Sequence, residues 1–311
     1  MGFVRVRKFA AEYTRAMSDV SPLDRLIARA ESLIERLELV LPPPPIATDW
    51  AGAIAFRWRK RNGRGELQAV RHPHPIRLED LENIADQKAR IVANTRQFVA
   101  GKSANNVLLT GSRGSGKSSL VKAVLNEFSP QGLRLIEVDK DDLVDLPEIV
   151  DLLEGRQERF ILFCDDLSFE AGETAYKALK SVLDGSVAAP PDNVLIYATS
   201  NRRHLMPEYF SENLETKRVD DEIHPGEAVE EKISLSERFG LWISFYPFSQ
   251  DDYLAVAQHW LRHFGVPEEE IGDCEREALN WALGRGSRSG RVAWQFARDY
   301  AGRSTDAGGA A

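Results

Sequence analysis

The sequence predicts an α/β fold, in which a sheet lies between helices, followed by a smaller all-helical domain. Three observations predict this architecture. Short apolar runs alternate with helical patterns between about residues 79 and 248, as in proteins built from strand–helix–strand units. A glycine-rich loop at 111–118 joins one of these runs to a helical pattern. Between about 249 and 303, apolar residues recur only at helical spacing.

Four segments follow from these patterns. Residues 1–78 form an N-terminal extension, 79–248 the α/β domain, 249–303 the helical domain and 304–311 a tail that we expect to be disordered. A chain of 311 residues suits one large domain or two ordinary ones. With 43% hydrophobic and 28% charged residues, it is able to bury a core.

Composition excludes several classes of protein. Two cysteines, Cys164 and Cys274, make no disulfide framework. The apolar runs all fall short of the ~18 residues that a membrane helix needs. The first residues also lack the apolar stretch of a secretory signal. We therefore expect a cytoplasmic protein without a membrane partner.

Charge is unevenly distributed along the chain. The net charge is −8, but residues 1–78 hold 14 Lys and Arg against 8 Asp and Glu, so the remaining residues carry −14. An acidic main body disfavours non-specific binding to DNA. The basic extension keeps nucleic acid open as an alternative partner.

The extension contains a predicted amphipathic helix. Ser21 is a typical N-cap, and Pro22 suits the first helical turn. Apolar residues then recur at helical spacing: Leu23, Leu26, Ile27, Ala30, Leu33, Ile34 and Leu37. Four prolines at 42–45 follow as a stiff spacer. The helix either packs on its own domain or docks on a partner or neighbouring subunit.

A β-hairpin is predicted after the spacer. Asn62-Gly63 lies between alternating runs at 53–61 and 66–70, and this dipeptide favours a tight hairpin turn. In an extended strand, three basic side chains share one face and two aromatic ones the other: Arg57, Arg59 and Arg61 against Phe56 and Trp58. Such a hairpin is either half-buried with a solvated face or a surface for single-stranded nucleic acid.

The glycine-rich loop matches G-x-x-x-x-G-K-[ST] in full. An apolar strand at 106–110 precedes it and a helical pattern at 119–125 follows, which predicts a phosphate cradle of backbone N–H groups at a helix N-terminus. Lys117 would reach the β- and γ-phosphates, and the Ser118 hydroxyl would bind Mg²⁺. The predicted phosphate-binding residues are Gly111, Ser112, Arg113, Gly114, Ser115, Gly116, Lys117, Ser118 and Ser119.

Two further strands are predicted to end in polar side chains. The apolar run at 160–164 ends at Asp165 and Asp166, 48 residues beyond Lys117. Asp165 would join the Mg²⁺ shell, and Asp166 would orient or deprotonate an attacking water. The run at 193–199 leads to Asn201, whose amide could hydrogen-bond the γ-phosphate or that water.

A long polar insert at 202–237 separates this strand from the next motif. Between residues 208 and 237 it holds ten acidic and three basic residues. It could move with the nucleotide state, engage a partner or form a solvated loop.

In combination these motifs resemble the AAA+ ATPases, over about residues 76–300. The segment 76–84 is similar to the one that borders the adenine pocket in that superfamily. The segment 235–241 looks like the motif that carries its arginine finger, which gives that role to Arg238. The segment 286–293 looks like the start of its sensor-2 helix, with Arg291 the better match and Arg288 in reserve, and Asn201 matches sensor 1.

Four stretches look closer to one bacterial family of predicted AAA+ ATPases, which is classified as a domain of unknown function. These stretches are residues 55–59, 94–111, 160–170 and 176–185. The resemblance implies a five-stranded parallel sheet, a helical lid, ATP and Mg²⁺ as cofactors, and ATP hydrolysis coupled to remodelling of an unknown protein client. It also implies a homo-oligomer, because Arg238 would act on the neighbouring subunit. A DNA-associated loader and a nucleotide-gated scaffold that hardly hydrolyses ATP are the alternatives.

The chain departs from the superfamily at one position. Most AAA+ proteins have Asp-Glu where this chain has Asp165-Asp166. Aspartate is one methylene shorter, and a general base is sensitive to its reach. Three alternatives follow: Asp166 acts on the water with a shifted backbone, Glu170 supplies the carboxylate instead, or hydrolysis is slow. As the residue that acts on the water, we rank Asp166 first and Glu170 second.

Overall fold

The computed structural model describes residues 21–40, 48–61, 63–169, 173–185, 191–201, 205, 217–219, 222–224 and 235–307. The chain forms two compact units, Met1–Ala47 and Thr48–Ala311.

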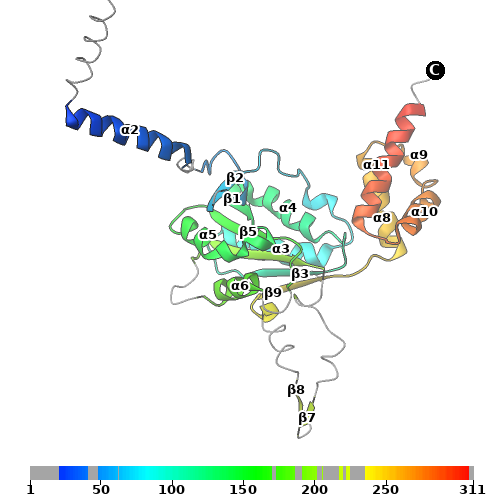
Figure 1. The fold of residues 1–311 in the computed structure, drawn as a ribbon. Helices are drawn as coiled ribbons and strands as arrows, with labels where there is room; N and C mark the ends of the chain where they lie inside the picture. The colour runs from blue at the N-terminus through cyan, green and yellow to red at the C-terminus, as the bar shows by residue number, and fades with distance from the viewer. Residues whose placement is uncertain are drawn as a thin grey trace, which may run out of the picture. The chain divides into compact units, whose positions relative to one another are not determined.

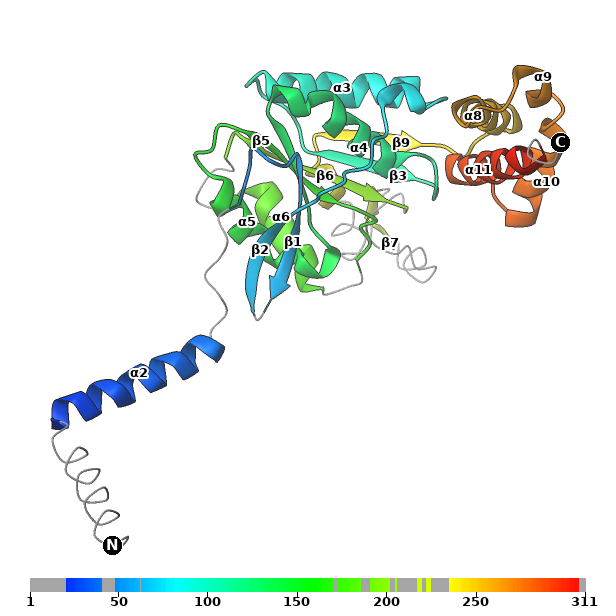
Figure 2. The ribbon, with the colours of Figure 1, turned by 90° about the horizontal axis from the view of Figure 1, so that it is seen from above.

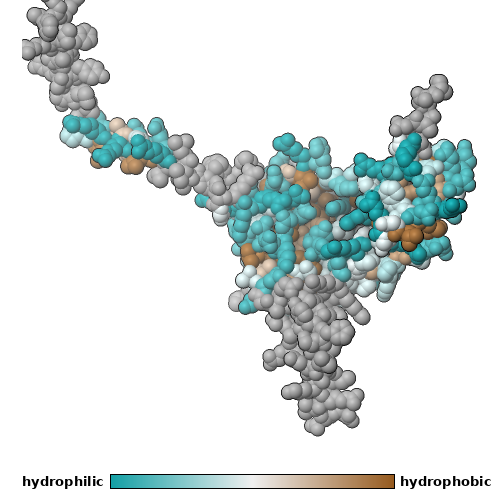
Figure 3. Space-filling model, turned by 45° about the vertical axis from the view of Figure 1, so that its right-hand side comes forward, coloured by the Kyte–Doolittle hydropathy of each residue, from teal (hydrophilic) through white to brown (hydrophobic). Residues whose placement is uncertain are grey.

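The first unit contains helix α2 (Pro22–Val40), which begins where the sequence predicts (Figure 1). The Leu23 backbone N–H donates to Ser21 Oγ at 3.2 Å, so Ser21 caps the helix. Polar and apolar residues gather on different sides of α2 (Figure 3). Five apolar side chains of the predicted stripe are 46–68% exposed: Leu23, Leu26, Ile27, Leu33 and Ile34. The proline spacer lies outside the described residues.

A seven-stranded sheet forms the centre of the second unit, in the order β2-β1-β4-β5-β6-β3-β9. Its strands are β1 (Ala55–Arg61), β2 (Arg64–Ala69), β3 (Val107–Gly111), β4 (Leu133–Glu137), β5 (Arg159–Cys164), β6 (Val194–Ser200) and β9 (Leu241–Phe245). Six strands, β1, β4, β5, β6, β3 and β9, are parallel to their neighbours, and β2 is antiparallel to β1, so the sheet has seven strands where the resemblance implied five. The two additional strands, β1 and β2, lie at the β4 edge.

These two strands are the predicted hairpin, which we had expected in an extension outside the α/β domain. Strand β1 pairs in parallel with β4, with Ala55 opposite Leu135. On one face of β1, the side chains of Phe56 and Trp58 are fully buried in the core. The other face carries ion pairs to residues at and beyond the end of β4: Arg57 with Glu137 at 2.6 Å, and Arg59 with Asp139. Burial of the aromatic face and pairing of the basic face explain why the hairpin joins the sheet.

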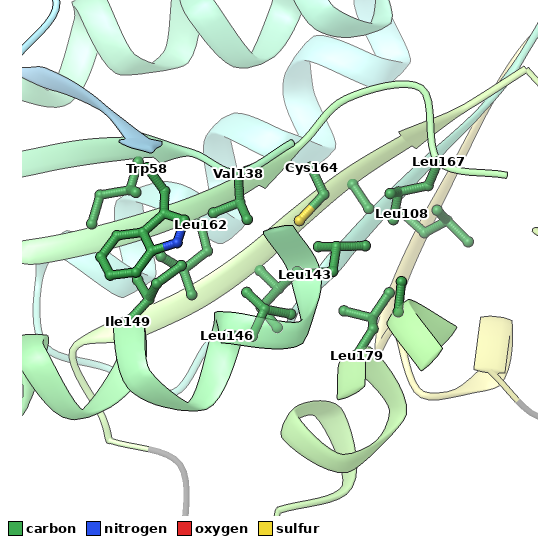
Figure 4. Close-up of a cluster of buried hydrophobic side chains, with 14 of the residues drawn as sticks. Trp58, Leu108, Val138, Leu143, Leu146, Ile149, Leu162, Cys164, Leu167 and Leu179 are labelled. Atoms are coloured by element: carbon green, nitrogen blue, oxygen red, sulfur yellow. The ribbon is translucent and has the colours of Figure 1, made fainter. Parts of the chain in front are cut away.

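Helices cover both faces of the sheet (Figure 1). On one side lie α3 (Ala85–Val99) and α4 (Lys117–Phe128), and on the other α5 (Leu146–Leu153) and α6 (Thr174–Asp184). Strand side chains alternate between two cores: Ile161 joins the α3–α4 side, whereas Leu162 joins the α5–α6 side. Figure 4 shows the second core, where Trp58 and Leu108 meet side chains of α5 and α6.

The C-terminal helices gather in a group of their own, the lid (Figure 2). They are α8 (Gln250–His263), α9 (Glu268–Ile271), α10 (Glu275–Arg285) and α11 (Gly290–Ala307). They share a core in which Tyr253 and Phe296 are fully buried. Between α9 and α10 the chain turns at Gly272, a residue that costs a helix interior about 1 kcal/mol.

Two predicted segments are described only in part. The insert at 202–237 lies largely outside the described residues, apart from elements such as an antiparallel pair of short strands, β7 (Lys217–Val219) and β8 (Glu222–His224). Helix α11 continues four residues beyond 303 to Ala307, and 308–311 lie outside the described residues. Across the described part of the chain, every helix is too short or too polar to traverse a lipid bilayer.

Candidate functional site

The glycine-rich loop connects the end of β3 to the start of α4 as predicted. Gly111 has φ +138° and Gly116 has φ +101°, in a region of backbone conformation that favours glycine. A Cβ at Gly111 would also collide with the carbonyl oxygen of Phe245 on the neighbouring strand. These positions allow the loop to fold back tightly and deliver Lys117 as the first residue of α4.

Lys117 is a buried cation, with 6% of its surface exposed. Its Nζ donates to the carbonyl oxygens of Gly111 and Ser112, both at 2.8 Å, and to Asn201 Oδ1 at 3.1 Å. Burial lowers the pKa of the Lys117 ammonium to about 8, although Asp166 and Asp165 act in the opposite direction. The site therefore holds a positive charge whose solvation by water is largely replaced by protein oxygens.

Asp165 follows the end of β5 and lies beside the loop helix. Its Oδ1 accepts a hydrogen bond from Ser118 Oγ at 2.6 Å and another from Thr199 Oγ1 at 2.6 Å. The structure thus brings together Ser118 and Asp165, the two residues predicted to hold Mg²⁺. Thr199 belongs to β6, which lies next to β5 in the sheet.

Asp166 has a left-handed backbone, with φ +53°. Among residues other than glycine, Asn and Asp adopt this conformation most readily. Its carboxylate accepts a hydrogen bond from Asn201 Nδ2, and its backbone N–H donates to Thr199 Oγ1 at 2.8 Å. The left-handed turn gives a physical reason for aspartate at the position where most AAA+ proteins have glutamate.

These groups line one cavity of about 610 Å³. Its loop and strand-end residues are Arg113, Gly114, Ser115, Gly116, Lys117, Ser118, Ser119, Asp165, Asp166, Thr199 and Asn201. The segment preceding β3 contributes His74, Ile76, Asp80, Leu81, Glu82 and Ile84, and the lid with the residue before it contributes Phe248, Val256, Trp260, Gly290, Arg291 and Trp294. Of the predicted phosphate-binding residues, Gly111 and Ser112 are not among the lining residues; their carbonyls hold Lys117 instead.

The start of α11 contacts the loop directly. A Cβ placed on Gly114 would lie 2.8 Å from Ser289 Oγ and 3.3 Å from Arg291 Cβ. The close approach brings Arg291, the predicted sensor-2 residue, to the cavity. Arg288, its reserve, is exposed and is not among the lining residues.

One predicted residue is not among the lining residues, and another lies outside the part of the chain that the structure describes. Arg238 is not among the lining residues and forms an ion pair with Asp184 at the end of α6. Glu170, the alternative to Asp166, lies outside the described residues.

The residues present fit a magnesium ion that is shared with a nucleotide. In the described part of the chain, no group of three or more His, Cys, Asp and Glu side chains is arranged to hold a metal alone. Ser118 and Asp165 offer a hydroxyl and a carboxylate, the oxygen ligands that Mg²⁺ prefers. Mg²⁺ commonly takes its remaining ligands from phosphate oxygens and water.

A family model described as "Protein of unknown function (DUF815)" matches residues 51–304. The chain belongs to the DUF815 family. Its glycine-rich loop, parallel sheet, strand-end carboxylates and helical lid form an AAA+-type fold, as the resemblance in the sequence implied. Among proteins of curated function, none matches this DUF815 protein significantly.

Several solved structures are similar to the DUF815 chain. The RuvB Holliday junction branch migration motor of Thermotoga maritima shares 14% identity at a TM-score of 0.41, over 71% of each chain. Replication initiator DnaA, bound to AMPPCP and single-stranded DNA, shares 16% at 0.45, over 72% of this chain and 63% of its own. A chain of the Escherichia coli MS115-1 HORMA:CdnC:Trip13 complex shares 11% at 0.45, over 71% of this chain and 90% of its own.

Sequence reasoning missed Thr199 and the aromatic wall of the cavity. Thr199 stood inside an apolar run that was read only as a strand, although a hydroxyl there needs a partner when buried. Phe248, Trp260 and Trp294 come from separate parts of the C-terminal region. Their large side chains in a polar helical segment were the available signal.

Proposed function

We propose that this DUF815 protein binds ATP with Mg²⁺ and hydrolyses it. The observation that carries the proposal is the single cavity in which the glycine-rich loop, Lys117, two strand-end carboxylates and Arg291 converge. Backbone N–H groups and a buried lysine are suited to a triphosphate. The two carboxylates beside the loop are suited to binding a metal ion and orienting a water. A site that only binds phosphate would not need these carboxylates.

The predicted residues that line the cavity have separate roles in this proposal. Lys117 binds the β- and γ-phosphates, and Arg291 reaches the phosphates from the lid. Ser118 and Asp165 hold Mg²⁺, which when bound would neutralise phosphate charge. Asp166 accepts a proton from the attacking water or orients it, and the Asn201 amide steadies that water or the γ-phosphate.

Arg238 and the lid extend the proposal to an assembly. Because Arg238 is not among the residues that line the cavity of its own chain, we propose that it acts on the ATP of a neighbouring subunit in a head-to-tail homo-oligomer. The contact between Ser289 and Gly114 links the lid to the phosphate loop. Turnover of ATP would move the lid and remodel a protein client.

The first experiment measures ATP binding by calorimetry and ATP hydrolysis by phosphate release. Lys117→Ala should abolish both, because the cavity loses its buried cation. Lys122→Ala is the matched control, since Lys122 lies on the same helix but is not among the lining residues. Equal binding by wild type and Lys117→Ala would contradict the proposal.

The assembly is tested by mixing two inactive variants. Arg238→Ala keeps an intact cavity, and Lys117→Ala keeps an intact Arg238. If the arginine acts between subunits, the mixture should hydrolyse ATP faster than either variant alone. A mixture no faster than its components would contradict action between subunits.

The same hydrolysis assay separates the alternatives. Stimulation by DNA that falls steeply with salt would favour a DNA-associated loader. Negligible turnover at high protein concentration, with intact binding, would favour a nucleotide-gated scaffold. We expect no DNA stimulation through the hairpin, because Arg57, Arg59 and Lys60 are already paired with acidic residues.

A further inference from the structure

Thr199 is a buried hydroxyl residue near the end of β6, with 1% of its surface exposed. Its side chain and backbone contact three consecutive residues beyond β5. Thr199 Oγ1 lies 2.6 Å from Asp165 Oδ1 and 2.8 Å from the backbone nitrogen of Asp166. Its carbonyl oxygen accepts from the Leu167 N–H at 2.7 Å. Thr199 therefore contacts each of the three residues of the turn that carries both carboxylates.

The direction of these hydrogen bonds is fixed by chemistry. A backbone N–H can only donate, so Thr199 Oγ1 accepts from Asp166. The single hydroxyl hydrogen is then available for the Asp165 carboxylate, which can only accept when ionised. Ser118 Oγ lies 2.6 Å from the same Oδ1 atom, so the two hydroxyls together fix the rotation of the Asp165 carboxylate.

The same contacts stabilise the unusual backbone at Asp166. A non-glycine residue in the left-handed region persists only where its surroundings hold it. Here the Thr199 hydroxyl accepts from the N–H of Asp166, and the Thr199 carbonyl oxygen accepts from the N–H of Leu167. These two N–H groups flank the left-handed Cα of Asp166 along the chain. The Asp166 carboxylate is thereby presented to Asn201.

We propose that Thr199 is a positioning residue of the site. Its hydroxyl orients Asp165 toward the Mg²⁺ that Ser118 and Asp165 hold, and it fixes the turn that presents Asp166 to the attacking water. This proposal rests on the proposed function, since it assigns Thr199 to the metal and water side of the same cavity. It predicts that Thr199 acts on Mg²⁺-dependent binding and not on the loop's own hold on phosphate.

The test compares Thr199→Val, which keeps the shape but removes the hydroxyl, with Thr199→Ser, which keeps the hydroxyl. The affinity for a fluorescent non-hydrolysable ATP analogue is measured with and without Mg²⁺. Thr199→Val should bind the analogue without Mg²⁺ within about twofold of wild type but lose about 10- to 100-fold of the gain that Mg²⁺ gives. Thr199→Ser should restore most of that gain.

Thr95→Val is the matched control for loss of a buried hydroxyl. Thr95 is fully buried on α3 and bonds to Ile91 O and Tyr197 Oη. It should keep the full gain from Mg²⁺, whatever its thermal stability. A Thr199→Val protein with the wild-type gain would overturn the proposal, and so would one that loses binding equally with and without Mg²⁺.

Failure of the proposed function gives a different result. In that case the wild-type protein itself would bind the analogue no better with Mg²⁺ than without it. Failure of the Thr199 assignment leaves the wild-type gain intact and shows only in the variants.

Discussion

At the scale of a single residue, the buried ammonium of Lys117 determines how the cavity would bind phosphate. The chain buries its ammonium and surrounds it with two carbonyl oxygens and the Asn201 amide oxygen. These acceptors hold the cation in place but do not restore full solvation, so the charged form is disfavoured. An incoming phosphate would supply the negative charge that the surroundings lack, and binding depends on the proton that Lys117 carries.

This dependence predicts how nucleotide affinity changes with pH. Burial lowers the pKa of Lys117 to about 8, so the ammonium is charged below that pH and neutral above it. Affinity for ATP should fall as pH rises from 7.5 to 9.5, approaching about tenfold per unit above pH 8. Calorimetry across this range measures the effect. In Lys117→Ala any residual binding should lack this decline, and a flat profile in wild type would contradict the prediction.

At the scale of elements, the hairpin is held by a buried polar contact as well as by its aromatic face. Trp58 Nε1 donates to Asp145 Oδ2 at 3.0 Å, and Lys60 Nζ pairs with Asp145 Oδ1 at 2.7 Å. Asp145 itself is 9% exposed. One carboxylate thus joins β1 to the short helix that precedes α5.

Removing this carboxylate should loosen the hairpin. Asp145→Ala leaves the buried Trp58 N–H without its acceptor, so the free energy of unfolding should fall by about 1–3 kcal/mol. Asp141→Ala is the matched control, an exposed aspartate in the same short helix, and should change it by less than about 0.5 kcal/mol. Urea unfolding measures both. Equal effects of the two substitutions would show that the contact does not stabilise the hairpin.

The hairpin also shows why part of the fold escapes sequence reasoning. The turn at Asn62-Gly63 is a local signal, and it predicted two paired strands correctly. Their place in the sheet depends on β4, where Arg57 meets Glu137 at a sequence separation of 80 residues. Nothing local to β1 identifies a partner so distant.

Some residues of the candidate site could likewise be predicted from local sequence, and others could not. The loop and the Asp165-Asp166 pair could be found from sequence because each is a contiguous motif with a fixed order of residues. Thr199 acquires its role only when β6 lies beside β5, and Trp260 reaches the cavity only through the packing of the lid. The left-handed backbone of Asp166 is likewise a property of the folded turn.

At the scale of the whole molecule, the compact unit begins at Thr48, well before the boundary at 78 expected from sequence. The hairpin lies between the two positions. Its Phe56 and Trp58 belong to the same core as Leu162 of the central sheet. A cut that removes the hairpin therefore also opens that core and leaves the edge of β4 unpaired.

Two truncated proteins should distinguish these boundaries. Removal of residues 1–47 should leave the urea midpoint and the ATP affinity unchanged, because Thr48–Ala311 is compact by itself. Removal of residues 1–70 should lower the midpoint and increase aggregation in light scattering, since an exposed strand edge and an open core favour association. Equal midpoints for the two proteins would place the hairpin outside the cooperative unit.

The position of the hairpin has a consequence during synthesis. Because Glu137 follows Arg57 by 80 residues, and chains grow at about 5–20 residues per second, the hairpin leaves the ribosome about 4–16 s before its partner strand. In that interval Phe56 and Trp58 have no β4 to lie against. The nascent chain then exposes these two aromatic side chains although the phosphate loop at 111–118 has already been translated, and the strand-end carboxylates at 165 and 166 follow only after β4.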